Sequence, residues 1–176
     1  MKINNIINRI KSINSNIKFI GEFDENNLRT GYWENYFSSG IIHRRGNYIN
    51  GKKTGYWKVY WDDGKLYSKG NYINGLEDGY WVWFYYNDNL MRKGNYLNGK
   101  EDGYWEWFYS NGNIELKGNY INGKKDGYWE YYHENGNLWM KGNFLNGKRD
   151  SIWEEYWNNG DFLEKKNYIN GILHEL

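Results

Sequence analysis

Tryptophan recurs in this chain at a fixed interval of 24 residues. The six positions are Trp33, Trp57, Trp81, Trp105, Trp129 and Trp153. Six Asn-Gly pairs keep the same interval, from Asn50-Gly51 to Asn170-Gly171. A constant period of this length is typical of a protein built from stacked repeats. We therefore expect six repeats over residues 31–174, preceded by half a repeat at residues 21–30, with residues 21–176 forming one domain.

Each repeat contains two runs of strand-forming residues separated by turn residues. In the repeat that begins at Gly127, an aromatic run at 128–133 precedes the turn Glu134-Asn135-Gly136 and a second run at 138–145. Aromatic and aliphatic runs of this kind favour strands, and Asn-Gly favours the tight turn of a hairpin. Every connection is too short for a parallel crossover. The predicted fold class is therefore all-β, an elongated and open antiparallel meander of about twelve strands.

A glycine recurs inside the second strand of the first five repeats, at Gly46, Gly70, Gly94, Gly118 and Gly142. Glycine weakens a strand interior and usually marks the close approach of another group. We expect a Trp or Tyr ring of the neighbouring strand to lie on it. The last repeat has Lys166 at this position and Ser151 in place of its first glycine, as expected of a terminal repeat with nothing packed beyond it.

Residues 1–20 differ in composition from the repeats. Isoleucines near helical spacing, among them Ile3, Ile6 and Ile10, alternate with basic residues, which predicts a short amphipathic helix. We expect this helix to cap the open edge of the array. A basic helix that lies on an anionic membrane is the alternative. The interrupted apolar stretches do not fit a signal peptide.

The charge and cysteine content exclude several classes of function. The chain has 23 Lys and Arg against 22 Asp and Glu, for a formal net charge of +1, which gives no reason to expect a nucleic-acid partner. It has no cysteine, so a disulfide framework and a thiolate metal site are both excluded. The absence of disulfides fits a reducing compartment. We expect a cytoplasmic location, in the host cell if the source is a virus.

The repeat resembles a known repeat family. The stretch G-N-Y-I-N-G-K-K-D-G at 118–127, followed by Y-W-E-Y-Y-H-E-N-G, resembles the MORN repeat. Trp129 and its equivalents stand where many MORN repeats have glycine, which is similar to a second MORN subtype. That subtype is found in bacterial proteins labelled YwqK-family antitoxins and in proteins of large DNA viruses. The resemblance implies a hairpin array for protein contacts, sometimes for dimerisation or lipid association, with no shared catalytic residue.

No group of residues in the sequence indicates catalysis, metal binding or cofactor binding. The three histidines, His43, His133 and His174, occupy different positions in their repeats, and no nucleotide fingerprint or nucleophile motif occurs. A column of glutamates follows the tryptophans, at Glu34, Glu106, Glu130 and Glu154. A basic column, from Arg45 to Lys165, is expected to pair with it across the strands, or alternatively to bind phosphates or anionic lipid. We therefore do not expect an enzyme.

Two aromatic columns are the candidates for a partner site. One contains Trp61, Tyr85, Tyr109, His133 and Trp157, and the other, two residues earlier, contains Trp83, Trp107 and Tyr131. These rings either stack as a core or, if exposed, form a patch that binds a partner.

The predicted function is accordingly a non-enzymatic scaffold that binds a protein through an aromatic face or edge of the sheet. The alternatives are a membrane-lipid scaffold and a binder of carbohydrate or cell wall. The strand edge at 167–176 also favours pairing with a second copy, so a homodimer is expected as a further assembly.

Overall fold

The computed structural model describes residues 19–175, which contain fourteen β-strands and no helix. The chain separates into an N-terminal unit, residues 1–78, and a C-terminal unit, residues 79–176, and each is described by itself. The strands of the N-terminal unit are β1 (Phe19–Phe23), β2 (Arg29–Tyr36), β3 (Ile42–Ile49), β4 (Lys52–Tyr60) and β5 (Leu66–Ile73). β6 (Leu76–Phe84) begins at the end of this unit, and the C-terminal unit continues with β7 (Leu90–Leu97), β8 (Lys100–Phe108), β9 (Ile114–Ile121), β10 (Lys124–Tyr132), β11 (Leu138–Leu145), β12 (Lys148–Tyr156), β13 (Phe162–Ile169) and β14 (Ile172–His174).

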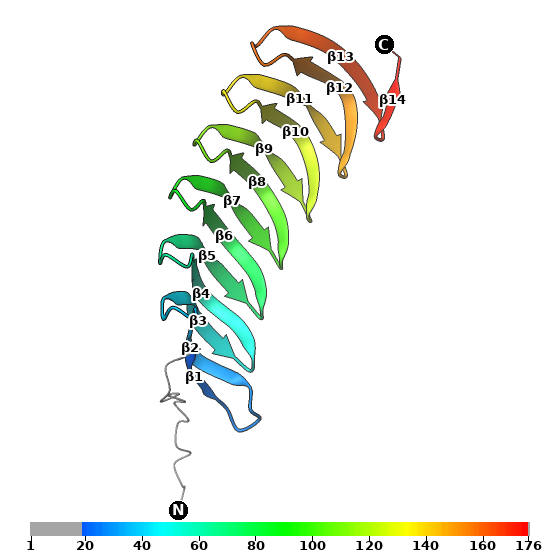
Figure 1. Cartoon of the computed structure of the whole chain (residues 1–176). Coiled ribbons are helices and arrows are strands. Elements are labelled where there is room, and N and C mark those ends of the chain that lie inside the picture. Colours follow the sequence, from blue (N-terminus) through cyan, green and yellow to red (C-terminus); the bar gives the residue numbers. More distant parts are fainter. Residues whose placement is uncertain (1–18, 176) are drawn as a thin grey trace, which may run out of the picture. The chain divides into compact units, whose positions relative to one another are not determined.

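Within each unit, every strand pairs antiparallel with the next strand along the chain (Figure 1). The prediction of an all-β antiparallel meander is thus confirmed. The described residues hold fourteen strands instead of about twelve, because β1 and the short β14 flank the hairpins of the six repeats. The helix expected at residues 1–20 lies outside the described residues, apart from 19 and 20, which belong to β1.

The Asn-Gly pairs form the hairpin turns as expected. Asn122 and Gly123, for example, have φ angles of 53° and 78°, and both belong to the left-handed region that this type of turn requires. The amide of Gly123 donates a hydrogen bond of 2.8 Å to the carbonyl of Glu101, so that the turn is also bound to the preceding hairpin. Asp88, which replaces the glycine of another hairpin turn, has φ 68°.

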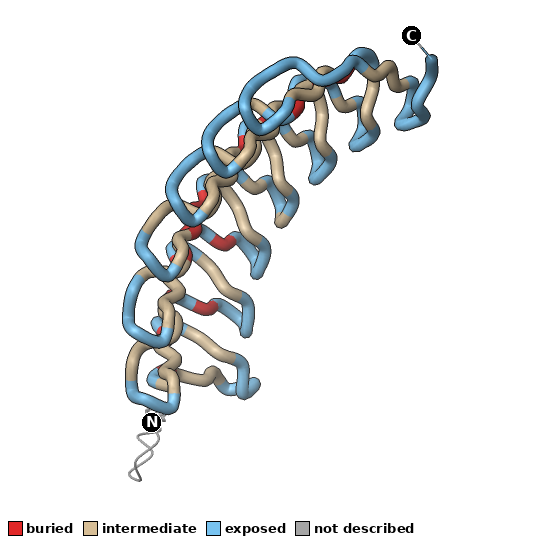
Figure 2. Tube along the Cα trace, turned by 45° about the horizontal axis from the view of Figure 1, so that its top comes forward, coloured by how far each residue is buried: buried red, intermediate tan, exposed pale blue. Residues whose placement is uncertain are grey.

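Within each unit, core tryptophans lie on a glycine of the preceding strand. A Cβ atom at Gly118 would lie 2.3 Å from Cδ2 of Trp129, so no side chain fits beneath the ring. The Trp129 indole Nε1–H donates to the carbonyl of Asn119, at 3.1 Å. The expected contact between glycine and ring is therefore confirmed, and it also joins Gly21 of β1 to Trp33. Buried positions recur in this way from hairpin to hairpin, while the turns are exposed (Figure 2).

Further rings fill the space between neighbouring tryptophans. In the C-terminal unit, Trp107 stacks on Trp105 with a centroid distance of 5.3 Å and lies 5.9 Å from Trp129. Tyr120 meets Trp129 edge-on at 5.0 Å. Such edge-to-face and offset contacts are the geometries that aromatic rings prefer. The C-terminal unit thereby obtains a core of contacting aromatic rings.

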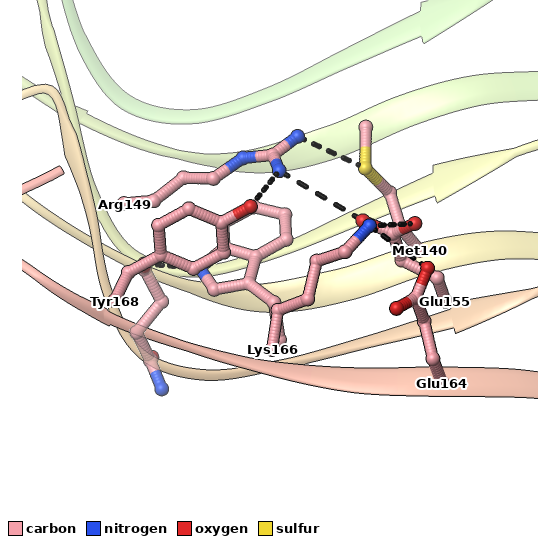
Figure 3. Close-up of polar contacts among 8 residues, drawn as sticks. Met140, Arg149, Glu155, Glu164, Lys166 and Tyr168 are labelled. Carbon is pink, nitrogen blue, oxygen red and sulfur yellow. Dashed lines mark hydrogen bonds and ion pairs between the residues drawn. The ribbon is translucent and has the colours of Figure 1, made fainter. Parts of the chain in front are cut away.

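The last repeat departs from this pattern at Lys166, where the other repeats have glycine. The Lys166 ammonium forms ion pairs with Glu155 at 2.9 Å and Glu164 at 3.0 Å (Figure 3). Next to them, Arg149 Nη1 donates to the Tyr168 hydroxyl at 3.1 Å. Charged and polar contacts thus replace the tryptophan that covers the glycine strand elsewhere. Residues 167–169, expected at the sheet edge, pair with β14.

Candidate interaction surface

Each repeat presents two different faces of the sheet, because neighbouring residues of a strand point in opposite directions. Trp105 is 0% exposed, whereas its neighbour Tyr104 is 49% exposed. We call the face that carries Trp105 and its equivalents the tryptophan face, and the face that carries Tyr104 and its equivalents the tyrosine face. The two faces separate the core of the array from its exposed aromatic surface.

The predicted column of Trp83, Trp107 and Tyr131 lies on the tryptophan face. Trp83 is only 6% exposed and stacks between Trp81 and Trp105, with centroid distances of 5.5 and 5.8 Å. Trp107 and Tyr131 are half-buried. These rings extend the aromatic core, which gives them a structural role whether or not their remaining exposed edges contact a partner.

The Lys125 side chain covers part of the tryptophan face. Its Nζ lies 4.3 Å from the ring centroid of Trp129 and 4.8 Å from that of Tyr131, and it donates a hydrogen bond of 2.6 Å to the Tyr131 hydroxyl. Burial disfavours the charged amine, and the nearby Arg149 guanidinium repels it, so the pKa of Lys125 falls to about 8. This is the most strongly perturbed amine on the aromatic core.

The other predicted column, which contains Trp61, Tyr85, Tyr109 and His133, lies at the hairpin ends. Three of its members form hydrogen bonds with the next repeat. The hydroxyls of Tyr85 and Tyr109 donate to the carbonyls of Phe108 and Tyr132, at 2.8 and 2.7 Å. His133 Nε2 lies 3.1 Å from the Tyr156 carbonyl, which can only accept, so Nε2 carries the proton. Trp61, in the N-terminal unit, packs edge-on against Tyr67. The contacts of Tyr85, Tyr109 and His133 tie successive hairpins together. Partner binding by this column stays a prediction.

The tyrosine face carries exposed rings that the sequence interpretation missed. They are Tyr32 and Tyr56 in the N-terminal unit, and Tyr80, Tyr104 and Tyr128 in the C-terminal unit. Exposed aliphatic residues accompany them, including Leu97, Ile121 and Leu145 of the C-terminal unit. The available signal was position: the tyrosine directly precedes the core tryptophan and must therefore point to the opposite face.

Alternating lysines and glutamates run beside the exposed tyrosines of the C-terminal unit. Lys93 pairs with Glu106 at 2.7 Å and Lys117 with Glu130 at 2.8 Å. Glu154 is held between two lysines, Lys141 at 3.1 Å and Lys165 at 3.0 Å. The expected cross-strand pairing of the acidic and basic columns is thus confirmed in this unit.

These contacts shift the pKa of the groups involved. Hydrogen bonds from the Tyr156 hydroxyl and from Lys165 and Lys141 lower the pKa of Glu154 to about 2. The hydrogen bond to Glu154 in turn raises the pKa of Lys141 to about 12. Both groups are therefore charged throughout the neutral range.

A hollow of about 250 Å³ opens on the tyrosine face of the C-terminal unit. It is lined by Tyr128, Lys141, Gly142, Asn143, Ile152 and Glu154. Its charged groups are already paired with each other, and its apolar walls are a tyrosine and an isoleucine.

Within residues 19–175, no group of three or more His, Cys, Asp or Glu side chains could hold a metal ion. The same part of the chain has no helix long and apolar enough to cross a membrane.

Comparison with known proteins agrees with the repeat geometry. The family described as MORN repeat variant matches residues 29–50, 53–74, 77–98, 101–122 and 125–146, together more than half of the chain. The repeat with Ser151 and Lys166 lies outside these matches. A search of curated proteins gives no significant match. MORN repeats are generally non-enzymatic modules that interact with proteins or membranes. With five consecutive matched repeats, each folded as an antiparallel hairpin, this chain belongs to the MORN-repeat family in its variant form.

Proposed function

We propose that this chain is a non-enzymatic scaffold that binds a partner protein through its tyrosine face. The observation that carries the proposal is the row of half-exposed tyrosines, with Tyr80, Tyr104 and Tyr128 at equivalent positions of successive repeats. Isolated apolar residues are normal on a protein surface, but here a tyrosine recurs on every second strand, opposite an asparagine, and exposed leucines and isoleucines lie further along the intervening strands.

The composition of this face favours a protein as the partner. Tyrosine is enriched in protein interfaces because it offers a large contact area with few rotatable bonds and a polar tip. The rings stand on paired strands, so binding need not order a flexible loop. The lysines and glutamates beside them provide a polar rim.

The proposal is tested by affinity capture from a lysate of the source cell. The baits are the unaltered chain, the double variant Tyr104→Ser/Tyr128→Ser, and Trp157→Ser, which removes an equally exposed ring from a hairpin turn. Buried Trp83 is unsuitable for this test, because its loss would disturb the core. Loss of two exposed aromatic anchors should lower capture of the true partner at least about tenfold.

The outcome is read by quantitative mass spectrometry of the captured material. The proposal requires a protein that the unaltered chain and Trp157→Ser capture equally, and that the double variant loses. Capture that is equal for all three baits would contradict it. Recovery of lipid or glycan by the unaltered chain, with loss in the double variant, would instead support one of the alternative functions.

A further inference from the structure

The alternation of lysine and glutamate on the tyrosine face breaks down in the second repeat. In the C-terminal unit a carboxylate stands between every two neighbouring lysines, as Glu130 does between Lys117 and Lys141. In the N-terminal unit the equivalent position is Lys58, which lies directly opposite Arg45 on one side and Lys69 on the other. Three cations thus follow each other across three paired strands.

This arrangement leaves positive charge uncompensated. Glu34 faces Arg45 from the other side and also accepts hydrogen bonds from Tyr32 and Tyr36. Within the described part of the chain, neither Lys58 nor Lys69 forms an ion pair with a carboxylate. Like charges directly opposite each other destabilise a sheet. The second repeat therefore carries a stability cost that the repeats with glutamate avoid.

The fourth, fifth and sixth repeats have glutamate at this position, whereas the third has Val82. Glu154 lies between Lys141 and Lys165 and accepts a hydrogen bond of 2.8 Å from the Tyr156 hydroxyl. Glu130 is likewise bonded to Lys117 and to the Tyr132 hydroxyl. In these repeats one carboxylate lies among lysines and a tyrosine hydroxyl. In the second repeat Lys58 takes the place of that carboxylate, and the ring of the equivalent Tyr60 lies 5.4 Å from the Arg45 guanidinium.

We propose that Arg45, Lys58 and Lys69, here called the basic triad, bind an acidic side chain of a partner protein. The inference rests on the proposed function and specifies the chemistry of the partner at one point of the tyrosine face. Half-exposed Tyr56 lies two residues before Lys58, and the exposed Ile49 and Ile73 lie further along the strands of Arg45 and Lys69. The acidic residue is therefore expected next to apolar residues of the partner. A carboxylate arriving from the partner takes the role that glutamate has in the later repeats.

A second copy of the chain does not supply this carboxylate from its C-terminal unit. On the tyrosine face of that unit, Glu106, Glu130 and Glu154 are all held by lysines of the neighbouring strands. This alternating series, here called the lysine–glutamate ladder, contains four lysines and three glutamates. The positively charged triad would therefore meet a surface that is also positively charged. Charge complementarity therefore favours a different, acidic protein.

The test measures binding of a dye-labelled oligoglutamate peptide by fluorescence anisotropy at low ionic strength. Lys58→Glu restores the alternation found in the later repeats, so this variant should fold and melt at a higher temperature than the unaltered chain. It should nevertheless bind the peptide at least about tenfold more weakly, equivalent to about 1.4 kcal/mol. Lys52→Glu is the matched control, because it makes the same charge change at an exposed hairpin position.

A second variant transplants the triad. Glu130→Lys places a lysine between Lys117 and Lys141 and should raise the number of bound peptides from one to two per chain. An unchanged number in a folded Glu130→Lys variant would overturn the proposal. Equal weakening by Lys52→Glu and Lys58→Glu would also overturn it, since net charge alone would then explain binding.

The remaining measurements identify the chemical class of the bound anion. They also distinguish failure of the triad proposal from failure of the proposed scaffold function. Lys58-dependent binding of inorganic phosphate or phosphatidylserine vesicles, without binding of oligoglutamate, would overturn the proposal in favour of a phosphate ligand. Lys58 variants leave Tyr104 and Tyr128 intact. A partner lost with the tyrosine variant, combined with peptide binding that ignores Lys58, would reject the triad and retain the scaffold function.

Discussion

At the residue scale, the tryptophan and the glycine beneath it act as one structural element. The Trp105 ring covers Gly94, where a Cβ atom would lie 2.1 Å from Cδ2, and its indole Nε1–H donates to the Asn95 carbonyl at 3.0 Å. The large ring supplies apolar burial, and the missing side chain provides the space for it. Either partner alone would leave a void or a clash.

Replacement of the ring measures its part in this pair. Trp105→Ala should lower the free energy of unfolding by about 3–5 kcal/mol, because the cavity lies where nothing else can collapse into it. Trp157→Ala, at a ring that is 56% exposed, should cost less than about 1 kcal/mol. Denaturant melts of both variants provide the comparison. A cost below 1 kcal/mol for Trp105→Ala would show that this ring is not the core.

A double-mutant cycle tests the coupling between ring and glycine. Gly118→Ala should destabilise the unaltered chain by about 1–3 kcal/mol, because the added methyl group overlaps the Trp129 ring. In a Trp129→Ala background the same substitution should cost little, since the ring is gone. Equal costs in both backgrounds, measured by urea unfolding, would mean that the glycine serves backbone flexibility instead.

Lys125 should titrate well below Lys141. Its pKa is lowered to about 8 by burial and by Arg149, whereas that of Lys141 is raised to about 12. Because the folded pKa lies below the unfolded value of about 10.4, Lys125 makes unfolding less favourable as the pH rises from 8 towards 10. An NMR titration of the lysine Cε and Nζ resonances measures both groups. Coincident titration of Lys125 and Lys141 would refute the effect.

At the scale of the element, each hairpin is joined to its neighbours by turn, ring and charge contacts. The Tyr109 hydroxyl and the Gly123 amide each bond to a carbonyl in a neighbouring repeat. Lysine and glutamate side chains bridge the same strands on the tyrosine face. Isolated hairpins are marginal in water. A repeat therefore gains its order from the repeats on both sides.

The lysine–glutamate ladder should make the free energy of unfolding depend on pH in the acidic range. The folded pKa of Glu154 is about 2, below its unfolded value, so its contribution is present above about pH 4.3 and is lost as the pH falls towards 2. Glu154→Gln should reduce the loss of stability between pH 6 and pH 2.5 by up to about 1 kcal/mol, the usual limit for an exposed pair. Urea melts at both pH values measure this loss of stability in Glu154→Gln and in the unaltered chain. An equal loss in both would contradict a stabilising role of the ladder.

At the scale of the whole molecule, the chain is a series of similar hairpins of 24 residues each. Deletion of residues 103–126 removes one complete repeat and joins Asp102 to Gly127, as Asp126 is joined to Gly127 now. Each remaining tryptophan still follows its glycine strand, so the deletion should leave cooperative unfolding with a smaller denaturant slope.

Deletion of residues 103–114 is the matched comparison for this prediction. It removes residues 103–108 of β8, including Trp105, and leaves Gly94 uncovered. This shorter deletion should cause a larger loss of structure than removal of a full repeat, as measured by circular dichroism. Tolerance of both deletions would show that the register between ring and glycine does not control the fold.

The sequence predicts the architecture well because the same residues perform the same task in every copy. Gly118 and Trp129 are informative for this reason, and their contact could be expected from the pattern alone. The exposed tyrosines were missed because Tyr104 repeats as regularly as Trp105, so periodicity does not distinguish a core ring from a surface ring. Only the alternation of side chains along a strand separates them. The basic triad is visible only once Lys58 is placed between Arg45 and Lys69 by strand register.

The contact between ring and glycine also has a fixed order of synthesis. Trp129 lies on Gly118 and bonds to Asn119, both earlier in the chain, and Trp153 does the same with Gly142 and Asn143. A ribosome releases the glycine strand first and its covering ring shortly afterwards. Every tryptophan is thus synthesised after the glycine strand on which it packs. The nascent chain can therefore fold repeat by repeat, with little apolar surface left exposed until distant residues are made.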